Sequence, residues 1–312
     1  MKFDATAITE AIMESDRRRK TSLPRDLRFI CEPPSGGLGE IFDELSSQET
    51  IPSLRADKHS SYRLKSIHYL VSRFRKDLRY ESDDNVVNLV VGDPENSLVT
   101  ICAHYDVVPG SMGYNDNGSS CAVLIGLCER HVGDPNFCFV FLGREESGFY
   151  GSALHFSKYR PHLTINLDVI GGGENIVFHN NAVEGPLRYP LNALLEQMAL
   201  ERGAIRTDRL PVCDTDMIIH HGLDVITFSA FPDKDADYIR KTGHLACSEV
   251  IKYMHCGVYD DLEYVSLETM EKVELLLDDF IIAFNCAIKA RPEMMETLSI
   301  HRDTPYAMGI PC

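Results

Sequence analysis

The stretch PNFCFVFLGREESGFYGS (135–152) decides the fold class of this 312-residue chain. Its apolar run from Phe137 to Leu142 is nearly continuous and is bounded by Pro135 and Gly143, which is typical of a strand covered on both faces. A polar loop follows, and SALHFSKY (152–159) then has a helical pattern. The same alternation of strand and helix recurs along the chain. It predicts an α/β fold with a mixed, mostly parallel central sheet and helices on both faces.

Other elements follow from the same patterns. The strand-like runs are 85–91, 98–104, 163–170 and 224–230, and the helical patterns are 5–18, 64–74, 119–132, 187–203 and 266–290. The turn GDPENS (92–97) separates the first two of these strand-like runs. It predicts that they form a hairpin or lie next to each other in the sheet.

Charge and composition exclude some classes of function. The chain has 47 acidic residues against 31 Lys and Arg, a formal net charge of -16. Such a chain repels phosphate backbones and anionic lipids, so we expect no nucleic-acid and no membrane partner. The N-terminus has no apolar core of signal-peptide length, and the ten cysteines form no CxxC pair. We therefore expect reduced thiols and a cytoplasmic location.

Five segments carry the residues of a candidate site, and four of them follow a predicted strand, where ligands gather in open α/β sheets. In AHYDVVPG (103–110), His104 ends a strand and Asp106 points to the same side, so it can accept a hydrogen bond from the imidazole. In GYNDNGSS (113–120), Asp116 lies in a turn before a helix and has two oxygens with which to bridge two ions.

The other three segments supply further acids and a second histidine. In GREESGFYGS (143–152), one of Glu145 and Glu146 can ligate a metal while the other takes a proton. Asp168 lies in the apolar run LTINLDVI (163–170), where an unpaired carboxylate is unfavourable. His255 lies in YMHCGVYDDLEYVS (253–266), ahead of an acidic turn.

Each segment alone has an ordinary explanation, such as a turn, a helix cap or a solvated acidic loop. Together they form a ligand set for two zinc ions, for which cobalt or manganese can substitute. We expect His104 and Asp168 on one ion and Glu146 and His255 on the other. Asp116 would bridge them, with the ions about 3.5 Å apart and a hydroxide between them.

Several blocks of the chain also resemble one known family. They are AHYDVVPGSMGYNDNGSSCAVLIGL (103–127), GREESGFYGSALH (143–155), MHCGVYDDLEYVSLETM (254–270) and, with Asp214 at an Asp position of the family, CDTDMIIHHGLDVITFS (213–229). Their order is similar to that of the co-catalytic zinc aminopeptidases, peptidase family M28, over about residues 60–290.

The resemblance implies a three-layer α/β/α sandwich, the zinc-exopeptidase fold of the phosphorylase/hydrolase-like type. It implies that Glu145 is the general base, that Glu146 is a ligand and that Asp106 orients His104. It also implies a hydrolase, an aminopeptidase-like metalloprotease acting on a peptide or aminoacyl amide. The expected parts are an N-terminal helical and loop extension at 1–58, the catalytic domain at 59–290 and a C-terminal tail at 291–312.

Three alternatives stay open or can be set aside at this point. A glutaminyl-cyclase-like enzyme with a single zinc shares the carboxylate set, and a non-catalytic binding module would have lost a ligand, although none is missing here. A second two-zinc family, of deacylases and carboxypeptidases, also begins HxDVVP but carries a large inserted domain. The segment between Asp168 and His255 already contains core elements and leaves no room for such an insert.

Overall fold

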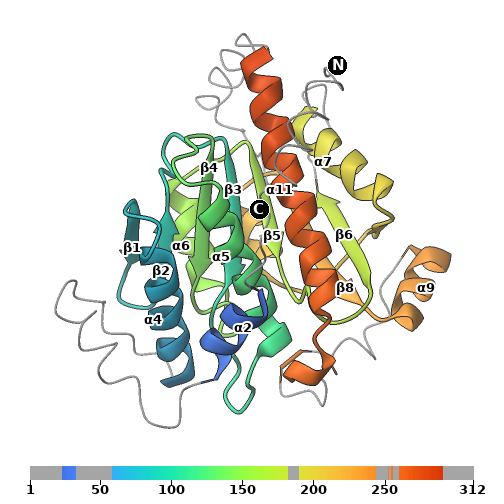
Figure 1. Cartoon of the computed structure of the whole chain (residues 1–312), viewed down its shortest axis with the longest axis horizontal. Helices are drawn as coiled ribbons and strands as arrows, with labels where there is room; N and C mark the ends of the chain where they lie inside the picture. The colour runs from blue at the N-terminus through green and yellow to red at the C-terminus, as the bar shows by residue number, and fades with distance from the viewer. Residues whose placement is uncertain are drawn as a thin grey trace, which may run out of the picture.

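A single eight-stranded sheet is the centre of the fold in the computed structural model, which describes residues 23–32, 58–181, 190–243, 252, 254–255 and 260–290. The strand order is β1-β2-β4-β3-β5-β8-β6-β7 (Figure 1). The strands are β1 (Leu78–Ser82), β2 (Val87–Val91), β3 (Val99–His104), β4 (Phe137–Leu142), β5 (Leu163–Leu167), β6 (Asn175–Asn181), β7 (Ile205–Arg206) and β8 (Val225–Phe231).

The four central strands run in the same direction. β3 is parallel to both β4 and β5, and β5 is parallel to β8. Towards the edges, β2 runs antiparallel to β4, and β6 runs antiparallel to β8. This arrangement confirms the predicted mixed α/β sheet. It also brings the carboxyl ends of β3, β4, β5 and β8 to one edge of the sheet.

Helices cover both faces of the sheet. In Figure 1, α4 (Lys58–Ser72), α5 (Ser120–Arg130) and α11 (Leu267–Ala290) lie in front of the strands, and α6 (Tyr150–Lys158) lies behind them. The remaining described helices are α2 (Leu23–Cys31), α7 (Pro190–Glu201), α8 (Asp214–His220) and α9 (Asp233–Thr242), with the short turns η1 (Tyr114–Ser119) and η3 (Leu262–Tyr264). The layering is therefore α/β/α, as predicted.

Strand β4 shows why this sequence forms a doubly covered sheet. All six of its residues are buried. Its phenylalanines Phe137, Phe139 and Phe141 belong to the cluster on the α5 and α11 side, and the residues between them belong to the cluster that contains Phe156 of α6. Successive side chains of a strand point to opposite faces, so an apolar run of this length needs cover on both.

Helix α2 is packed into the main core, although its residues fall within the predicted N-terminal extension. Leu27 and Ile30 are fully buried and belong to the same cluster as Ile101 of β3. The predicted helix at 5–18 and the tail at 291–312 lie outside the described residues. In the described part of the chain, the cysteines are free thiols, and no helix is long and apolar enough to cross a bilayer.

Two details differ from the predictions. β2 and β3 are not neighbours, because β4 lies between them and pairs with both. The parallel β3–α5–β4 unit places β4 against β3, and the other edge of β4 then receives β2. The strand predicted at 163–170 is also shorter than predicted: β5 ends at Leu167, and Val169 turns the chain with a φ of 50°. Asp168 therefore lies just beyond the strand.

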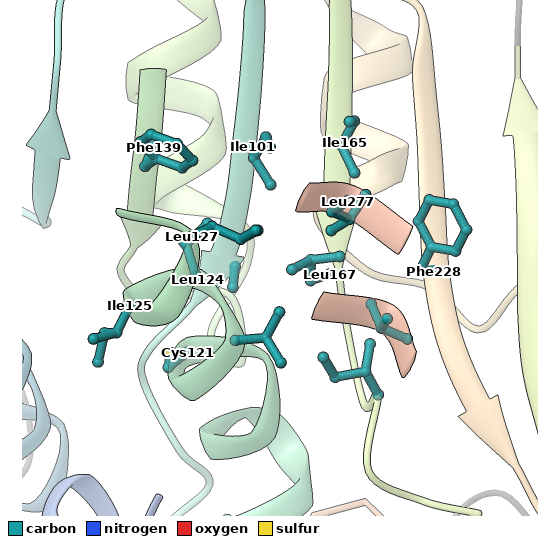
Figure 2. Close-up of a cluster of buried hydrophobic side chains, with 14 of the residues drawn as sticks. Ile101, Cys121, Leu124, Ile125, Leu127, Phe139, Ile165, Leu167, Phe228 and Leu277 are labelled. Carbon is teal, nitrogen blue, oxygen red and sulfur yellow. The ribbon is translucent and has the colours of Figure 1, made fainter. Parts of the chain in front are cut away.

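Leu277 of α11 tests how much the fold depends on the packing of this helix over the central strands. It is fully buried in the cluster that contains Ile165 and Leu167 of β5 (Figure 2). We expect Leu277→Ala to lower the free energy of unfolding by about 2–5 kcal/mol, because it removes buried methyl groups and leaves a cavity. Urea unfolding followed by circular dichroism measures this change.

Leu200 of α7 provides the matched control, because this residue is 48% exposed. The same substitution there, Leu200→Ala, should change stability by no more than about 0.5 kcal/mol. Equal losses in the two variants would contradict the placement of α11 over the core.

Candidate metal centre

The candidate residues converge where the parallel strands end. His104 is the last residue of β3 and pairs in register with Leu142, the last residue of β4. The chain that leaves β4 therefore passes beside His104 and carries Glu145 and Glu146. Asp168 follows directly after β5, which pairs with the other side of β3. The sheet thus gathers side chains from three strand ends, as expected for an open α/β sheet.

His104 lies at the centre of this group and is only 2% exposed. Its Nε2 is 3.3 Å from Asp116 Oδ1 and 3.6 Å from Asp168 Oδ1. Its Nδ1 is 3.5 Å from Asp106 Oδ1. The two ring nitrogens therefore face different carboxylates, with Asp106 on the side away from Asp116 and Asp168.

Asp116 presents its second oxygen to the second histidine. Its Oδ2 is 3.8 Å from His255 Nε2 and accepts a hydrogen bond from the backbone N–H of His255 at 3.2 Å. His255 Nε2 is also 3.4 Å from Glu146 Oε2. Asp116 is buried, whereas the His255 side chain is 50% exposed. The carboxylate of Asp116 thus lies between the two imidazoles.

Among the described residues, three groups of side chains could hold a metal ion, and within each group the ligand atoms lie within 4.8 Å of one another. They are His104 with Asp116 and Asp168, Asp116 with Glu146 and His255, and His104 with Glu145 and Glu146. The first two groups share Asp116 and no other residue. They have the composition of the two expected ligand sets. The third group contains both Glu145 and Glu146, so these distances alone do not decide which of the two glutamates is a metal ligand.

Asp106 contacts both the histidine and the glutamate loop. Besides facing His104 Nδ1, its carboxylate accepts hydrogen bonds from the backbone N–H groups of Glu145 at 3.0 Å and of Glu146 at 3.2 Å. The sequence predicted the first contact but not the other two. Asp106 therefore fixes the backbone of the loop that carries both glutamates, and it faces the imidazole of His104 without a hydrogen bond to it.

Two asparagines flank Asp116 and tie it to the end of β5. Asn117 donates to the carbonyl oxygen of Leu167 at 3.0 Å and accepts from the N–H of Val169 at 3.2 Å. Asn115 accepts from the N–H of Gly171 at 2.9 Å. In the sequence these residues suggested an ordinary turn. In the fold they hold Asp116 and Asp168 in a fixed relation.

The backbone near the acids adopts conformations that non-glycine residues rarely take. Four described non-glycine residues have a positive φ: Arg144, Phe149, Val169 and His255. Arg144 directly precedes Glu145, Val169 directly follows Asp168, and His255 is itself a candidate ligand. Such conformations are unfavourable and persist where the surroundings over-determine them, which is a frequent property of functional sites.

Asn88 and Arg63 are supporting residues that the sequence patterns did not reveal. Asn88 in β2 is fully buried, accepts from the N–H of Gly143 at 3.0 Å and donates to the carbonyl oxygen of Gly151 at 2.9 Å. It thereby closes the base of the loop that carries Glu145 and Glu146. The buried guanidinium of Arg63 donates to the carbonyl oxygen of Gly113 at 2.6 Å, next to the turn that holds Asp116.

The crowding of buried acids shifts their ionisation. Burial raises the pKa of Glu145 to about 10, and nearby acids add to this shift. Burial and the neighbouring Asp116 raise the pKa of Glu146 to about 8. Burial alone would lower the pKa of His104, but the surrounding carboxylates, that of Glu145 most strongly, raise it well above its usual value. The cluster therefore favours added positive charge.

Asp214 is a further acid beside this cluster. It begins α8 and is 1% exposed, and its Oδ1 accepts a hydrogen bond from Ser152 Oγ at 2.6 Å. Burial raises its pKa to about 7, and the nearby Asp168 adds to the shift. It belongs to none of the three groups with metal-binding geometry.

Comparison with known proteins finds relatives both among curated sequences and among solved structures. A vacuolar membrane protease of Clavispora lusitaniae is 26% identical over 212 residues, which is 62% of this chain and 20% of that protein. This chain therefore spans about a fifth of the relative's length.

Both solved structures are below 25% identity and show the fold alone. The LapA aminopeptidase of Legionella pneumophila has a TM-score of 0.58 at 13% identity, over 91% of this chain and 74% of that one. A glutaminyl cyclase of Porphyromonas gingivalis has a TM-score of 0.58 at 13% identity, over 84% of this chain and 98% of that one.

The sequence profile of peptidase family M28 matches residues 85–277, more than half of the chain. The matched range contains His104, Glu146 and His255, and it begins and ends within the α/β/α fold described above. The chain belongs to peptidase family M28, as the order of its motifs predicted.

Proposed function

We propose that this chain is a two-zinc exopeptidase, aminopeptidase-like, that hydrolyses a peptide or aminoacyl amide bond. The observation that carries the proposal is the pair of three-residue groups that share only Asp116. One group offers His104 and Asp168, the other Glu146 and His255. Imidazole nitrogens and carboxylate oxygens are the ligands that zinc takes in such sites.

The polar atoms of the cluster fit bound cations. Among the described residues, no hydrogen-bond donor reaches the buried oxygens Glu146 Oε1 and Asp168 Oδ1. Buried polar atoms are rarely left in this state, and unpaired buried acids are unfavourable. Two zinc ions would neutralise the acids, and they would supply Lewis acidity that polarises a carbonyl and lowers the pKa of a water.

We assign the proton transfer to Glu145 and ligation to Glu146. Glu146 Oε2 lies 3.4 Å from His255 Nε2, which places Glu146 in the group with the second histidine. Glu145 is 9% exposed, and its backbone is held by Asp106. Its carboxylate would take the proton from the attacking water and pass it to the leaving amine. Asp106 would keep His104 and this loop in one orientation.

A single-zinc cyclase is the second candidate. The likeness to the Porphyromonas gingivalis glutaminyl cyclase favours it, since that likeness covers nearly the whole of the cyclase chain. The presence of both histidines and of the full set of acids supports hydrolysis instead. We keep the cytoplasm as the proposed location, supported by the free thiols of the described cysteines; the vacuolar membrane named for the yeast relative gives no support to it.

Zinc content and substrate preference together test the proposal. Metal analysis of the purified, zinc-loaded protein should give two ions per chain, and aminoacyl reporter amides should be cleaved faster than acylated peptides. One ion per chain together with cyclisation of N-terminal glutamine would favour the cyclase. No ion and no turnover after zinc addition would exclude both enzymes.

Substitution of the two adjacent glutamates separates their roles. We expect Glu145→Gln to lower kcat by about 10²–10⁴-fold while both ions stay bound, because it removes only the proton acceptor. Glu146→Gln, the matched variant one residue on, should weaken zinc binding. Loss of zinc from Glu145→Gln with normal zinc content in Glu146→Gln would mean that the two roles are exchanged.

The raised pKa values predict how the stability of the metal-free protein depends on pH. The pKa of Glu146 is raised to about 8 and that of Asp214 to about 7, so their protonated forms stabilise the fold at low pH. This stabilisation is lost as the pH rises through those values. The thermal midpoint of the metal-free protein should therefore fall between about pH 5 and 8, by about 2–4 °C for each kcal/mol lost.

The difference between the metal-free and zinc-loaded forms isolates this effect. Repulsion within a chain of net charge -16 acts on both forms, but zinc stabilises the ionised acids only where it is bound. Zinc should therefore raise the midpoint more at pH 8 than at pH 5. An equal increase at both pH values would contradict the raised pKa values.

A further inference from the structure

Asp260 is a buried carboxylate for which the proposed reaction has no use. It lies five residues after His255 and is 5% exposed. It belongs to none of the groups with metal-binding geometry. Burial raises its pKa, so its position is unfavourable for a charged group unless its contacts offset the loss of water.

The hydrogen bonds of Asp260 to other described residues all lie around the turn that carries Asp116. Its Oδ1 accepts hydrogen bonds from the backbone N–H of Asn115 at 2.8 Å and of Asp116 at 3.2 Å. Its Oδ2 accepts a short hydrogen bond from Ser111 Oγ, and that hydroxyl oxygen accepts from the N–H of Gly113 at 2.9 Å. One carboxylate therefore fixes the chain from Ser111 to Asp116.

A second hydrogen bond links the turn of Asp116 to His255, and here Asp116 provides the accepting carboxylate. The Asp116 carboxylate accepts from the backbone N–H of His255 at 3.2 Å, while the Asp260 carboxylate accepts from the backbone N–H of Asp116. Each segment thus supplies a carboxylate to the backbone of the other. The two hydrogen bonds set the position of His255 relative to Asp116.

The two candidate ligand groups depend on this link to different degrees. His104 and Asp168 are attached to neighbouring parallel strands, and Asn117 holds the backbone on both sides of Asp168. His255 belongs to none of the described strands, has a φ of 51° and has a half-exposed side chain. Its backbone N–H donates to Asp116, whose own backbone N–H donates to Asp260.

We propose that Asp260 is the positioning residue that aligns His255 with Asp116, and that it thereby controls the affinity of one of the two metal sites. The inference rests on the proposed two-ion function. Loss of the Asp260 hydrogen bonds would weaken the group of Asp116, Glu146 and His255. The group of His104, Asp116 and Asp168 would lose much less affinity, because His104 ends β3, Asp168 follows β5, and Asn117 also ties the turn that carries Asp116 to the end of β5.

Zinc titration of the full chain against a chromophoric chelator tests the inference without any substrate. The unaltered protein should bind two ions. Asp260→Ala should keep one tight ion and bind the second about 10–100-fold more weakly, the usual effect of removing a residue that supports a metal ligand. Asp260→Asn keeps an oxygen that can accept from Asn115 and Asp116, so it should bind both ions with nearly the normal affinity.

The neighbouring Asp261 is the matched control. It is exposed, and its carboxylate accepts only from the N–H of Leu262 among the contacts of the described residues. Asp261→Ala changes the charge by the same amount and should leave both affinities unchanged. If Asp260→Ala does not fold, as judged by circular dichroism, Ser111→Ala removes the hydroxyl that holds Asp260 and should weaken the second ion alone.

The outcomes separate this inference from the function on which it rests. If Asp260→Ala, or Ser111→Ala where that variant replaces it, binds both ions as tightly as the unaltered protein does, the positioning role alone is overturned. Equal weakening of both ions would overturn it too, as would Asp260→Asn behaving like Asp260→Ala, which would point to charge instead of hydrogen bonding. A single ion in the unaltered protein would contradict the two-ion function itself, and the inference would fall with it.

Discussion

The position of Asp116 is the constraint on which the rest of the site depends. Its two carboxylate oxygens face two different imidazoles, of His104 and of His255. A shared ligand tolerates little displacement, because any movement towards one partner is a movement away from the other. The hydrogen bonds of Asn115 and Asn117 to the chain after β5 meet this requirement on one side. They connect a turn to a strand end more than 45 residues away in the sequence.

The second constraint is charge, because the same strand ends that position Asp116 also crowd several acids together. Parallel strands bring their ends together, and here they bring several acids into a region where burial raises the pKa of Glu145, Glu146 and Asp168. Backbone N–H groups stabilise Asp106, but they do not reach the remaining oxygens of Glu146 and Asp168 within the described residues. A fold that only needed stability would place neutral side chains there. The arrangement is understandable as the ligand set of cations.

Most strands and helices and the candidate site residues could be predicted from the sequence, because the patterns that indicate them are local and the fold is regular. The apolar run 137–142 predicted a buried strand, and the polar residues after it predicted the edge of the sheet at which the candidate site lies. The order β4 between β2 and β3 could not be read from the turn at 92–97, since strand neighbours are chosen by tertiary packing. The roles of Asn115, Asn117 and Asn88 were also hidden: their partners lie far along the chain, and in sequence they look like ordinary turn or strand residues.

The two candidate ion sites differ in burial and in the elements that carry their residues, and this difference affects how the proposed reaction would proceed. One consists of residues that are at most 6% exposed, two of which lie at the ends of adjacent strands; the other ends in a half-exposed histidine that belongs to none of the described strands. In the proposed reaction, a substrate arriving from solvent would meet the half-exposed His255 before the buried His104. Glu145 is 9% exposed, and its backbone N–H donates to Asp106, which also faces His104. In the proposed reaction the proton acceptor would then be sheltered from bulk water, and this would favour transfer of the proton to the leaving amine over its loss to solvent.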